Sequence, residues 1–86
     1  MTKADDLILY HYDTCPYCLR VRWALSRLGV EVQMRNIDES AQDLSDLMKA
    51  RGRRTVPVLR IKKEGGDTWM PESSDIVRYL EQRFGG

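Results

Sequence analysis

Residues 7–18 read Leu-Ile-Leu-Tyr-His-Tyr-Asp-Thr-Cys-Pro-Tyr-Cys, and this stretch decides the fold. Its first four residues are apolar and rich in strand formers, so they predict a buried β-strand over residues 7–10. Pro16 is well suited to the first turn of a helix, where no amide hydrogen is needed. Cys15 and Cys18 therefore lie where the first strand gives way to the first helix.

The rest of the chain alternates between helical and strand-like spacing of its apolar residues. These residues recur every three or four positions in the expected helices and every second position in residues 30–34, whereas the other expected strands begin in short apolar runs. The expected elements are strands over residues 7–10, 30–34, 56–61 and 68–70, and helices over residues 16–28, between Ser40 and Gly52, and from a cap at Ser73 or Ser74 to Phe84. The order βαβαββα predicts an α/β fold: a four-stranded mixed sheet flanked by three helices, with the first two strands parallel and the last two a hairpin.

Length and composition indicate one globular domain over residues 1–86. The chain is 42% hydrophobic and 31% charged, which is ordinary for such a domain. Its net charge of +1 gives no general argument for binding nucleic acid or an anionic membrane. The first six residues lack the apolar core of a secretory signal, and no stretch approaches the roughly 18–20 apolar residues of a membrane span. We expect a monomer in the cytoplasm.

The position of the two cysteines favours redox chemistry. A helix N-terminus has free amide hydrogens and partial positive charge, and both stabilise a thiolate there. Thiols at such positions have pKa values of roughly 3.5–7.5 instead of about 8.5. Cys15 is the expected nucleophile, and Cys18, one turn further along the helix, is the expected partner in a disulfide.

Two other interpretations of the cysteines remain. They could form half of a zinc site, but the sequence offers only His11 as a further ligand of the usual kind. They could instead be inert thiols in the core, since free cysteine is often a small buried residue. A cysteine pair at a strand–helix junction favours the redox interpretation over both.

The motifs resemble those of the glutaredoxins, a branch of the thioredoxin-fold superfamily. The segment 15–18, Cys-Pro-Tyr-Cys, resembles the dithiol glutaredoxin motif, and the segment 55–57, Thr-Val-Pro, resembles a second motif of that family. Residues 70–77 are similar to the glutathione-transferase-like subclass of glutaredoxins. Many glutaredoxins have Gly-Gly where this chain has Pro71-Glu72, so the transferase-like pattern is the closer one.

The resemblance implies glutathione as co-substrate, a cis peptide bond before Pro57 and a thioredoxin-like fold. The backbone of Val56 would then lie beside Cys15 and pair with the cysteinyl part of glutathione. Without the resemblance, Pro57 could equally be an edge-strand proline. The resemblance also implies that Glu72 and Ser73 hold the γ-glutamyl end, although residues 73–75 could simply cap and charge the last helix.

The remaining candidates surround these motifs. Arg53 or Arg54 could pair with the glycyl carboxylate of glutathione, because a guanidinium suits a carboxylate; we select Arg54. Tyr17 is expected at the site, although it also fits the apolar stripe of its helix. Trp23 and Trp69 are expected to be packing residues.

Three functions are compatible with this pattern. The first is a glutathione-dependent thiol–disulfide oxidoreductase that reduces protein disulfides or glutathione mixed disulfides, with no metal. The second is a non-catalytic glutathione-binding or partner-docking module. The third is an iron–sulfur carrier with Cys15 and glutathione as ligands, which the resemblance associates more with single-cysteine sites. We favour the first.

Overall fold

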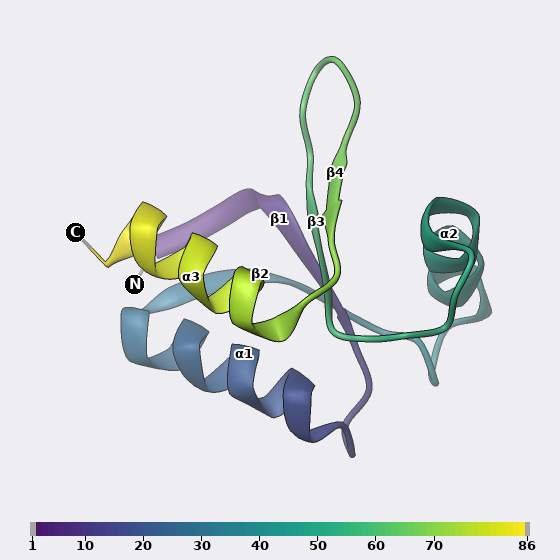
Figure 1. Ribbon diagram of the computed structural model, residues 1–86, viewed down its shortest axis with the longest axis horizontal. Coiled ribbons are helices and arrows are strands. Elements are labelled where there is room, and N and C mark those ends of the chain that lie inside the picture. The colour runs from purple at the N-terminus through teal and green to yellow at the C-terminus, as the bar shows by residue number, and fades with distance from the viewer. Residues whose placement is uncertain (1, 86) are drawn as a thin grey trace.

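The computed structural model describes residues 2–85 and contains the seven elements in the expected order (Figure 1). The elements are β1 (Thr2–His11), α1 (Pro16–Leu28), β2 (Val30–Asn36), α2 (Ala41–Arg51), β3 (Val58–Ile61), β4 (Thr68–Met70) and α3 (Ser73–Phe84). The α/β class and the βαβαββα order are confirmed. Within residues 2–85, no helix is long and apolar enough to cross a membrane.

The four strands form one mixed sheet in the order β2-β1-β3-β4. The parallel pairing of β1 with β2 and the antiparallel pairing of β3 with β4 are confirmed. Strand β1 also pairs antiparallel with β3, a neighbour that the sequence did not predict. Figure 1 shows α1 and α3 lying together, and the β3–β4 hairpin extending away from them. A short loop joins the carboxyl end of β1 to the start of α1, and the start of α1 lies near the start of α3.

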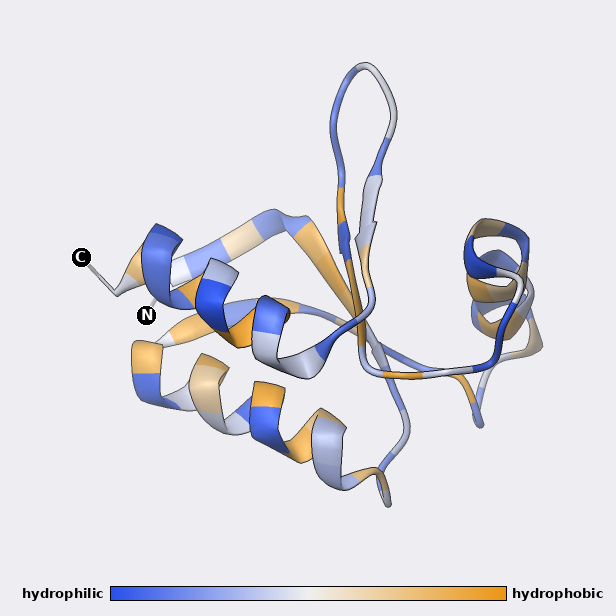
Figure 2. Cartoon of the chain, in the orientation of Figure 1, coloured by the Kyte–Doolittle hydropathy of each residue, from blue (hydrophilic) through white to orange (hydrophobic). Residues whose placement is uncertain are grey.

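The sheet separates two hydrophobic clusters. Alternate residues of β1 contribute to each, because successive strand side chains point to opposite faces. Leu7 and Leu9 join the larger cluster with residues of α1 and α3, and Ile8 and Tyr10 join the smaller one with Leu47 of α2. Figure 2 shows the hydrophilic loop of the β3–β4 hairpin outside both clusters.

Three strands differ in length from the expectation. Strand β2 continues two residues further, to Asn36. Strand β1 begins at Thr2, well before the apolar run, because it pairs with the start of β2 through a register shift between Lys3 and Ile8. Strand β3 begins at residue 58 instead of 56. Pro57 has no amide hydrogen to contribute to the ladder, and the strand starts directly after it.

The helix ends follow the sequence signals in two helices but not in the third. Gly29 and Gly52 end α1 and α2 in the left-handed conformation, and the Ser40 hydroxyl accepts a hydrogen bond from the Asp43 amide at 3.2 Å. The expectation that Ser73 or Ser74 caps α3 is wrong. The chain becomes helical one residue earlier, so the cap position falls on residue 72, where no side chain caps the helix.

One of the two tryptophans is not a packing residue. Trp69 packs as expected, with its ring centroid 5.3 Å from that of Tyr10. Trp23 is 69% exposed, so the expectation is wrong there. The buried stripe of α1 contains Val21 and Leu25, and Trp23 lies outside it.

Candidate functional site

Cys15 occupies the N-cap position of α1. Its backbone is extended, with φ −84° and ψ 114°, and Pro16 begins the helix directly after it. The Cys15 Sγ accepts a hydrogen bond from the Cys18 amide at 3.4 Å. The first turn of α1 contains no acidic residue that would oppose a negative charge. The sulfur therefore accepts a hydrogen bond from one of the free amides at the helix N-terminus. This arrangement stabilises a thiolate.

Cys18 has different surroundings from Cys15. Both are free thiols, with exposed fractions of 3% for Cys15 and 0% for Cys18. Burial, together with the hydrogen bond to Cys15, raises the pKa of the Cys18 thiol to about 12. Cys18 is thus a neutral thiol at physiological pH, next to the slightly more exposed Cys15.

The Val56–Pro57 bond is cis, as the sequence resemblance implies. This segment lies against Cys15, whose thiol donates to the Val56 carbonyl with a sulfur–oxygen distance of 3.8 Å. Residues 41 positions apart in the chain therefore meet at the nucleophilic sulfur. A ligand bonded to the Cys15 sulfur would lie within reach of the Val56 backbone.

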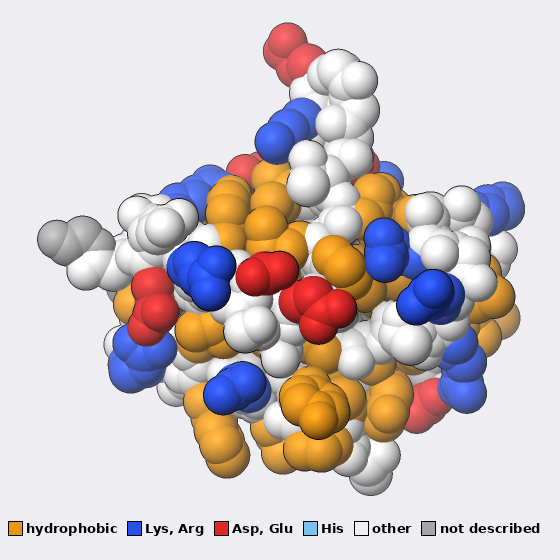
Figure 3. Space-filling model, in the orientation of Figure 1, with side chains coloured by type: hydrophobic (Ala, Val, Ile, Leu, Met, Phe, Trp, Pro, Cys, Tyr) orange, Lys and Arg blue, Asp and Glu red, His pale blue; other side chains and the backbone are white. Residues whose placement is uncertain are grey.

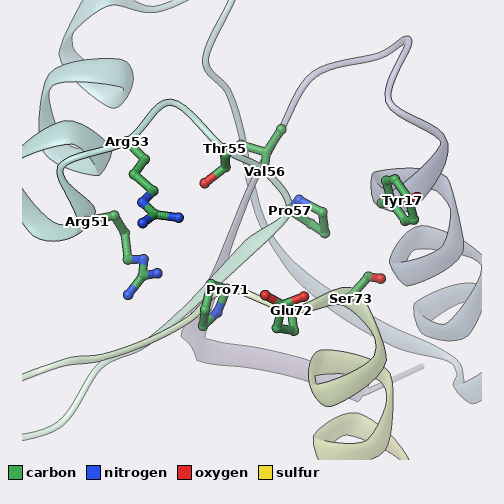
Figure 4. Close-up of a pocket in the computed structure, with 9 residues that line it drawn as sticks. All are labelled: Tyr17, Arg51, Arg53, Thr55, Val56, Pro57, Pro71, Glu72 and Ser73. Atoms are coloured by element: carbon green, nitrogen blue, oxygen red, sulfur yellow. The ribbon is translucent and has the colours of Figure 1, made fainter.

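A cavity of about 360 Å³ lies beside this contact. Its volume is within the range of small-molecule sites, about 300–1,000 Å³. Figure 4 shows its side chains arriving from separate elements: Arg51 and Arg53 from the end of α2 and the next loop, Glu72 and Ser73 from the start of α3, and Tyr17 from α1. Thr55, Val56, Pro57 and Pro71 complete the lining.

The charges of the cavity are mixed. Two arginines lie on one side, and the Glu72 carboxylate lies between them and Tyr17 (Figure 4). The Nε of Arg51 is buried and has no hydrogen-bond partner among residues 2–85. Figure 3 shows the same mixture on the molecular surface, where acidic side chains near the start of α3 face basic ones near the end of α2. The cavity therefore suits a small ligand that carries both negative and positive groups.

The structure brings most of the expected ligand-binding residues together. Tyr17, Val56, Pro57, Glu72 and Ser73 all line the cavity. Arg54 does not: its guanidinium pairs with Asp38 at 2.7 Å on the exposed surface.

Arg51, Arg53, Thr55 and Pro71 were not selected from the sequence but also line the cavity. The basic cluster at residues 51–54 was the available signal, but the sequence did not reveal which of its side chains face inward.

Two further residues lie near the cysteines. The negative charge of the Cys15 thiolate raises the pKa of the Tyr12 phenol. His11 is buried, with its Nδ1 atom unpartnered, and burial together with the charge of Arg22 lowers its pKa. Its imidazole is not part of the cavity lining.

Comparison with known proteins gives two related groups. The sequence model of one family, described as the N-terminal domain of glutathione S-transferase, matches residues 9–86. Glutaredoxin 2 of Escherichia coli is 32% identical over 78 residues, which cover 90% of this chain and 34% of that protein. A glutaredoxin of Vernicia fordii is 30% identical over 91 residues, covering 95% and 86% of the two chains. The chain thus spans about a third of the length of the bacterial relative.

Solved structures share the fold. A glutathione transferase homologue from Drosophila mojavensis with bound glutathione superimposes with a TM-score of 0.76, covering 95% of this chain and 36% of that one at 24% identity. A diazinon-metabolizing glutathione S-transferase from the silkworm Bombyx mori gives a TM-score of 0.70 at 31% identity, covering 91% and 37%. Both contain the same arrangement of strands and helices within a longer chain.

Proposed function

The chain belongs to the family of glutathione S-transferase N-terminal domains and is related to the glutaredoxins, and on that premise we propose that it is a glutathione-dependent thiol–disulfide oxidoreductase. Both groups of relatives support a glutathione-linked function. Cys15 is the proposed nucleophile and Cys18 the resolving thiol. The single domain over residues 1–86 and a location in the cytoplasm, a reducing compartment, are part of the same proposal.

The observation that carries the proposal is a helix-capping sulfur next to a cavity with the charges that glutathione requires. Glutathione has two carboxylates, one ammonium group and one thiol. Arg51 or Arg53 would pair with the glycyl carboxylate, since guanidinium–carboxylate pairs are strong and directional. At the other end, Glu72 would meet the ammonium group, and the Ser73 hydroxyl and the first amides of α3 would bind the γ-glutamyl carboxylate.

The proposed reaction begins with the Cys15 thiolate. It attacks the glutathione sulfur of a mixed disulfide, so that a Cys15–glutathione disulfide forms and the target protein leaves as a thiolate. A second glutathione thiolate then attacks the glutathione sulfur, which regenerates the Cys15 thiolate and releases oxidised glutathione. With a protein disulfide, attack by the Cys15 thiolate forms a Cys15–target mixed disulfide and releases the first target thiolate. The deprotonated Cys18 sulfur then attacks the Cys15 sulfur, which forms the Cys15–Cys18 disulfide and releases the second target thiolate. Two glutathione molecules then reduce that disulfide.

The high pKa of Cys18 fits the second role. A neutral thiol does not compete with Cys15 for the substrate, and it becomes a nucleophile only when its proton is lost in the mixed disulfide. Conjugation of glutathione to an electrophile, the chemistry of the transferases, would use neither a second thiol nor a disulfide intermediate. The buried partner of Cys15 therefore favours the oxidoreductase.

A coupled assay with the mixed disulfide of glutathione and 2-mercaptoethanol tests the proposal. The wild type should turn it over, Cys15→Ser should lose nearly all activity, and Cys18→Ser should keep it, because a second glutathione can resolve the intermediate. No turnover by the wild type, or full activity in Cys15→Ser, would refute the proposal. Thioether formation with a chlorodinitrobenzene in the absence of disulfide turnover would assign transferase chemistry instead.

A further inference from the structure

The outer side of α1 exposes two aromatic side chains. Tyr17 is 62% exposed and Trp23 69%. Together with Pro16 and Arg20 they line a shallow surface depression of about 450 Å³, which we call the α1 face. Residues 16, 20 and 23 are spaced so that they follow one side of a helix. Figure 3 shows hydrophobic side chains exposed along α1, at the lower edge of the molecule, with a basic side chain among them.

The α1 face carries one basic side chain, Arg20, beside its aromatic ones. Helix α1 contains three arginines and no acidic residue. Arg27 pairs with Glu81 of α3 at 3.1 Å, whereas none of the ion pairs within residues 2–85 includes Arg20. A free guanidinium beside an exposed indole complements acidic and apolar groups on a partner. Tryptophan and arginine are also the side chains that most often dominate binding at protein interfaces.

The α1 face is continuous with the candidate active site. Tyr17 lines both the cavity and the α1 face, and Pro16 directly follows Cys15. Trp23 lies eight residues after Cys15, which is about 12 Å along a helix. An extended polypeptide covers that distance in about four residues. A segment bonded through its cysteine to the site could therefore reach the indole.

We propose that the α1 face docks the protein substrate. The segment it fits is acidic and carries an apolar side chain about four residues from the cysteine that forms the disulfide. This inference rests on the proposed function. Glutathione would fill the cavity, so the polypeptide on the other sulfur must lie outside it, and the α1 face is the apolar surface that adjoins the cavity at Tyr17.

Two synthetic peptides, each glutathionylated at a single cysteine, provide the test. Both carry a leucine four residues from the cysteine; one is flanked by aspartates and the other by lysines. The kcat/KM for removal of glutathione should be about tenfold higher for the acidic peptide, a difference typical of one well-placed interface contact. Trp23→Ala should lower the value for both peptides, and Arg20→Gln should lower it for the acidic peptide alone.

Controls separate docking from chemistry. Neither variant should change turnover of the mixed disulfide of glutathione and 2-mercaptoethanol, which has no segment to dock. Met48→Ala, which removes another exposed apolar side chain on α2, should leave the rates on both peptides unchanged. Added salt should reduce the preference for the acidic peptide, because it screens exposed charges.

The outcomes also separate this inference from the proposed function. Equal wild-type rates on the two peptides, with normal turnover of the small disulfide, would overturn the docking role alone. An equal loss on all substrates in Trp23→Ala would do the same. If the wild type fails on the small disulfide, the oxidoreductase itself is refuted. A dimer in sedimentation experiments that Trp23→Ala dissociates would assign the α1 face to a second copy of the chain.

Discussion

Two thiols three residues apart have opposite tasks in the proposed reaction, and their positions on α1 explain why. Cys15 precedes the first helical residue, so its sulfur lies at the helix N-terminus and accepts the amide of Cys18. Cys18 lies one turn inside the helix on its buried stripe, where burial holds its proton. A separation of one helical turn thus gives the two cysteines different environments, which suit Cys15 to attack the substrate and Cys18 to resolve the mixed disulfide.

The arginines of residues 51–54 allow a prediction at the scale of single side chains. Arg51 lines the cavity with an unpartnered Nε, whereas Arg54 pairs with Asp38 outside it. Arg51→Gln should raise the KM for glutathione about tenfold, because a buried charge-assisted hydrogen bond contributes about 1.5–3 kcal/mol. Arg54→Gln, the matched control, removes only an exposed ion pair and should change the KM little. Steady-state kinetics with varied glutathione measures both.

The sequence does not show which arginines of residues 51–54 face the cavity. That Cys15 lies beside Val56 and Pro57 could be predicted, because these residues belong to motifs defined by residue type and position. The choice between Arg51 and Arg54 depends on the path of the backbone. Gly52, with φ 70°, turns the chain at the end of α2, so that Arg51 and Arg53 face the cavity while Arg54 faces Asp38. If Arg54 binds glutathione instead, Arg54→Gln would raise the KM for glutathione and Arg51→Gln would leave it unchanged. That result would contradict the prediction.

At the scale of elements, most of the fold was readable because each helix and strand carries its own local signal. Gly29, Gly52 and Ser40 mark ends that the structure confirms. Failures occurred where a partner elsewhere in the fold decides the outcome. Strand β1 extends to Thr2 only because β2 is there to pair with it. The start of α3 was predicted too late, because an acidic residue and two adjacent serines at residues 72–74 offer several possible cap positions.

The helix caps give a prediction about stability. The Ser40 hydroxyl accepts the Asp43 amide at the start of α2, whereas the Ser74 side chain is exposed and lies past the cap position of α3. Ser40→Ala should lower the free energy of unfolding by about 1 kcal/mol, the usual effect of losing an N-cap. Ser74→Ala should have a much smaller effect. Urea unfolding followed by circular dichroism compares the two, and a larger loss in Ser74→Ala would reassign the cap.

At the scale of the whole molecule, the dependence of stability on pH should reflect one buried side chain. His11 is the only histidine of the chain. It ends β1, and its ring is buried with Nδ1 unpartnered. Its charged neighbours come from one helix and two turns: Arg22 of α1 opposes protonation, whereas Asp13 before α1 and Glu39 after β2 favour it. Burial and Arg22 outweigh the two acids, so the pKa of His11 in the folded protein is lowered.

Unfolding exposes the ring and returns its pKa to about 6.5. The unfolded chain then binds the proton more tightly than the folded one. The contribution of His11 to stability is therefore complete above pH 6.5 and is lost as the pH falls toward its lower folded-state pKa. The free energy of unfolding should decrease in this range by at most about 1.4 kcal/mol per pH unit, the limit for one proton.

Replacement of the imidazole isolates this effect. His11→Gln should show a flatter dependence of the free energy of unfolding on pH between 7.5 and 5, measured by urea unfolding at several pH values. The comparison uses slopes, because the substitution itself changes the absolute stability of a buried position. Few other side chains titrate in this range, since ordinary carboxylates change charge nearer pH 4. Parallel slopes in the two proteins would mean that another group controls the loss of stability in mild acid.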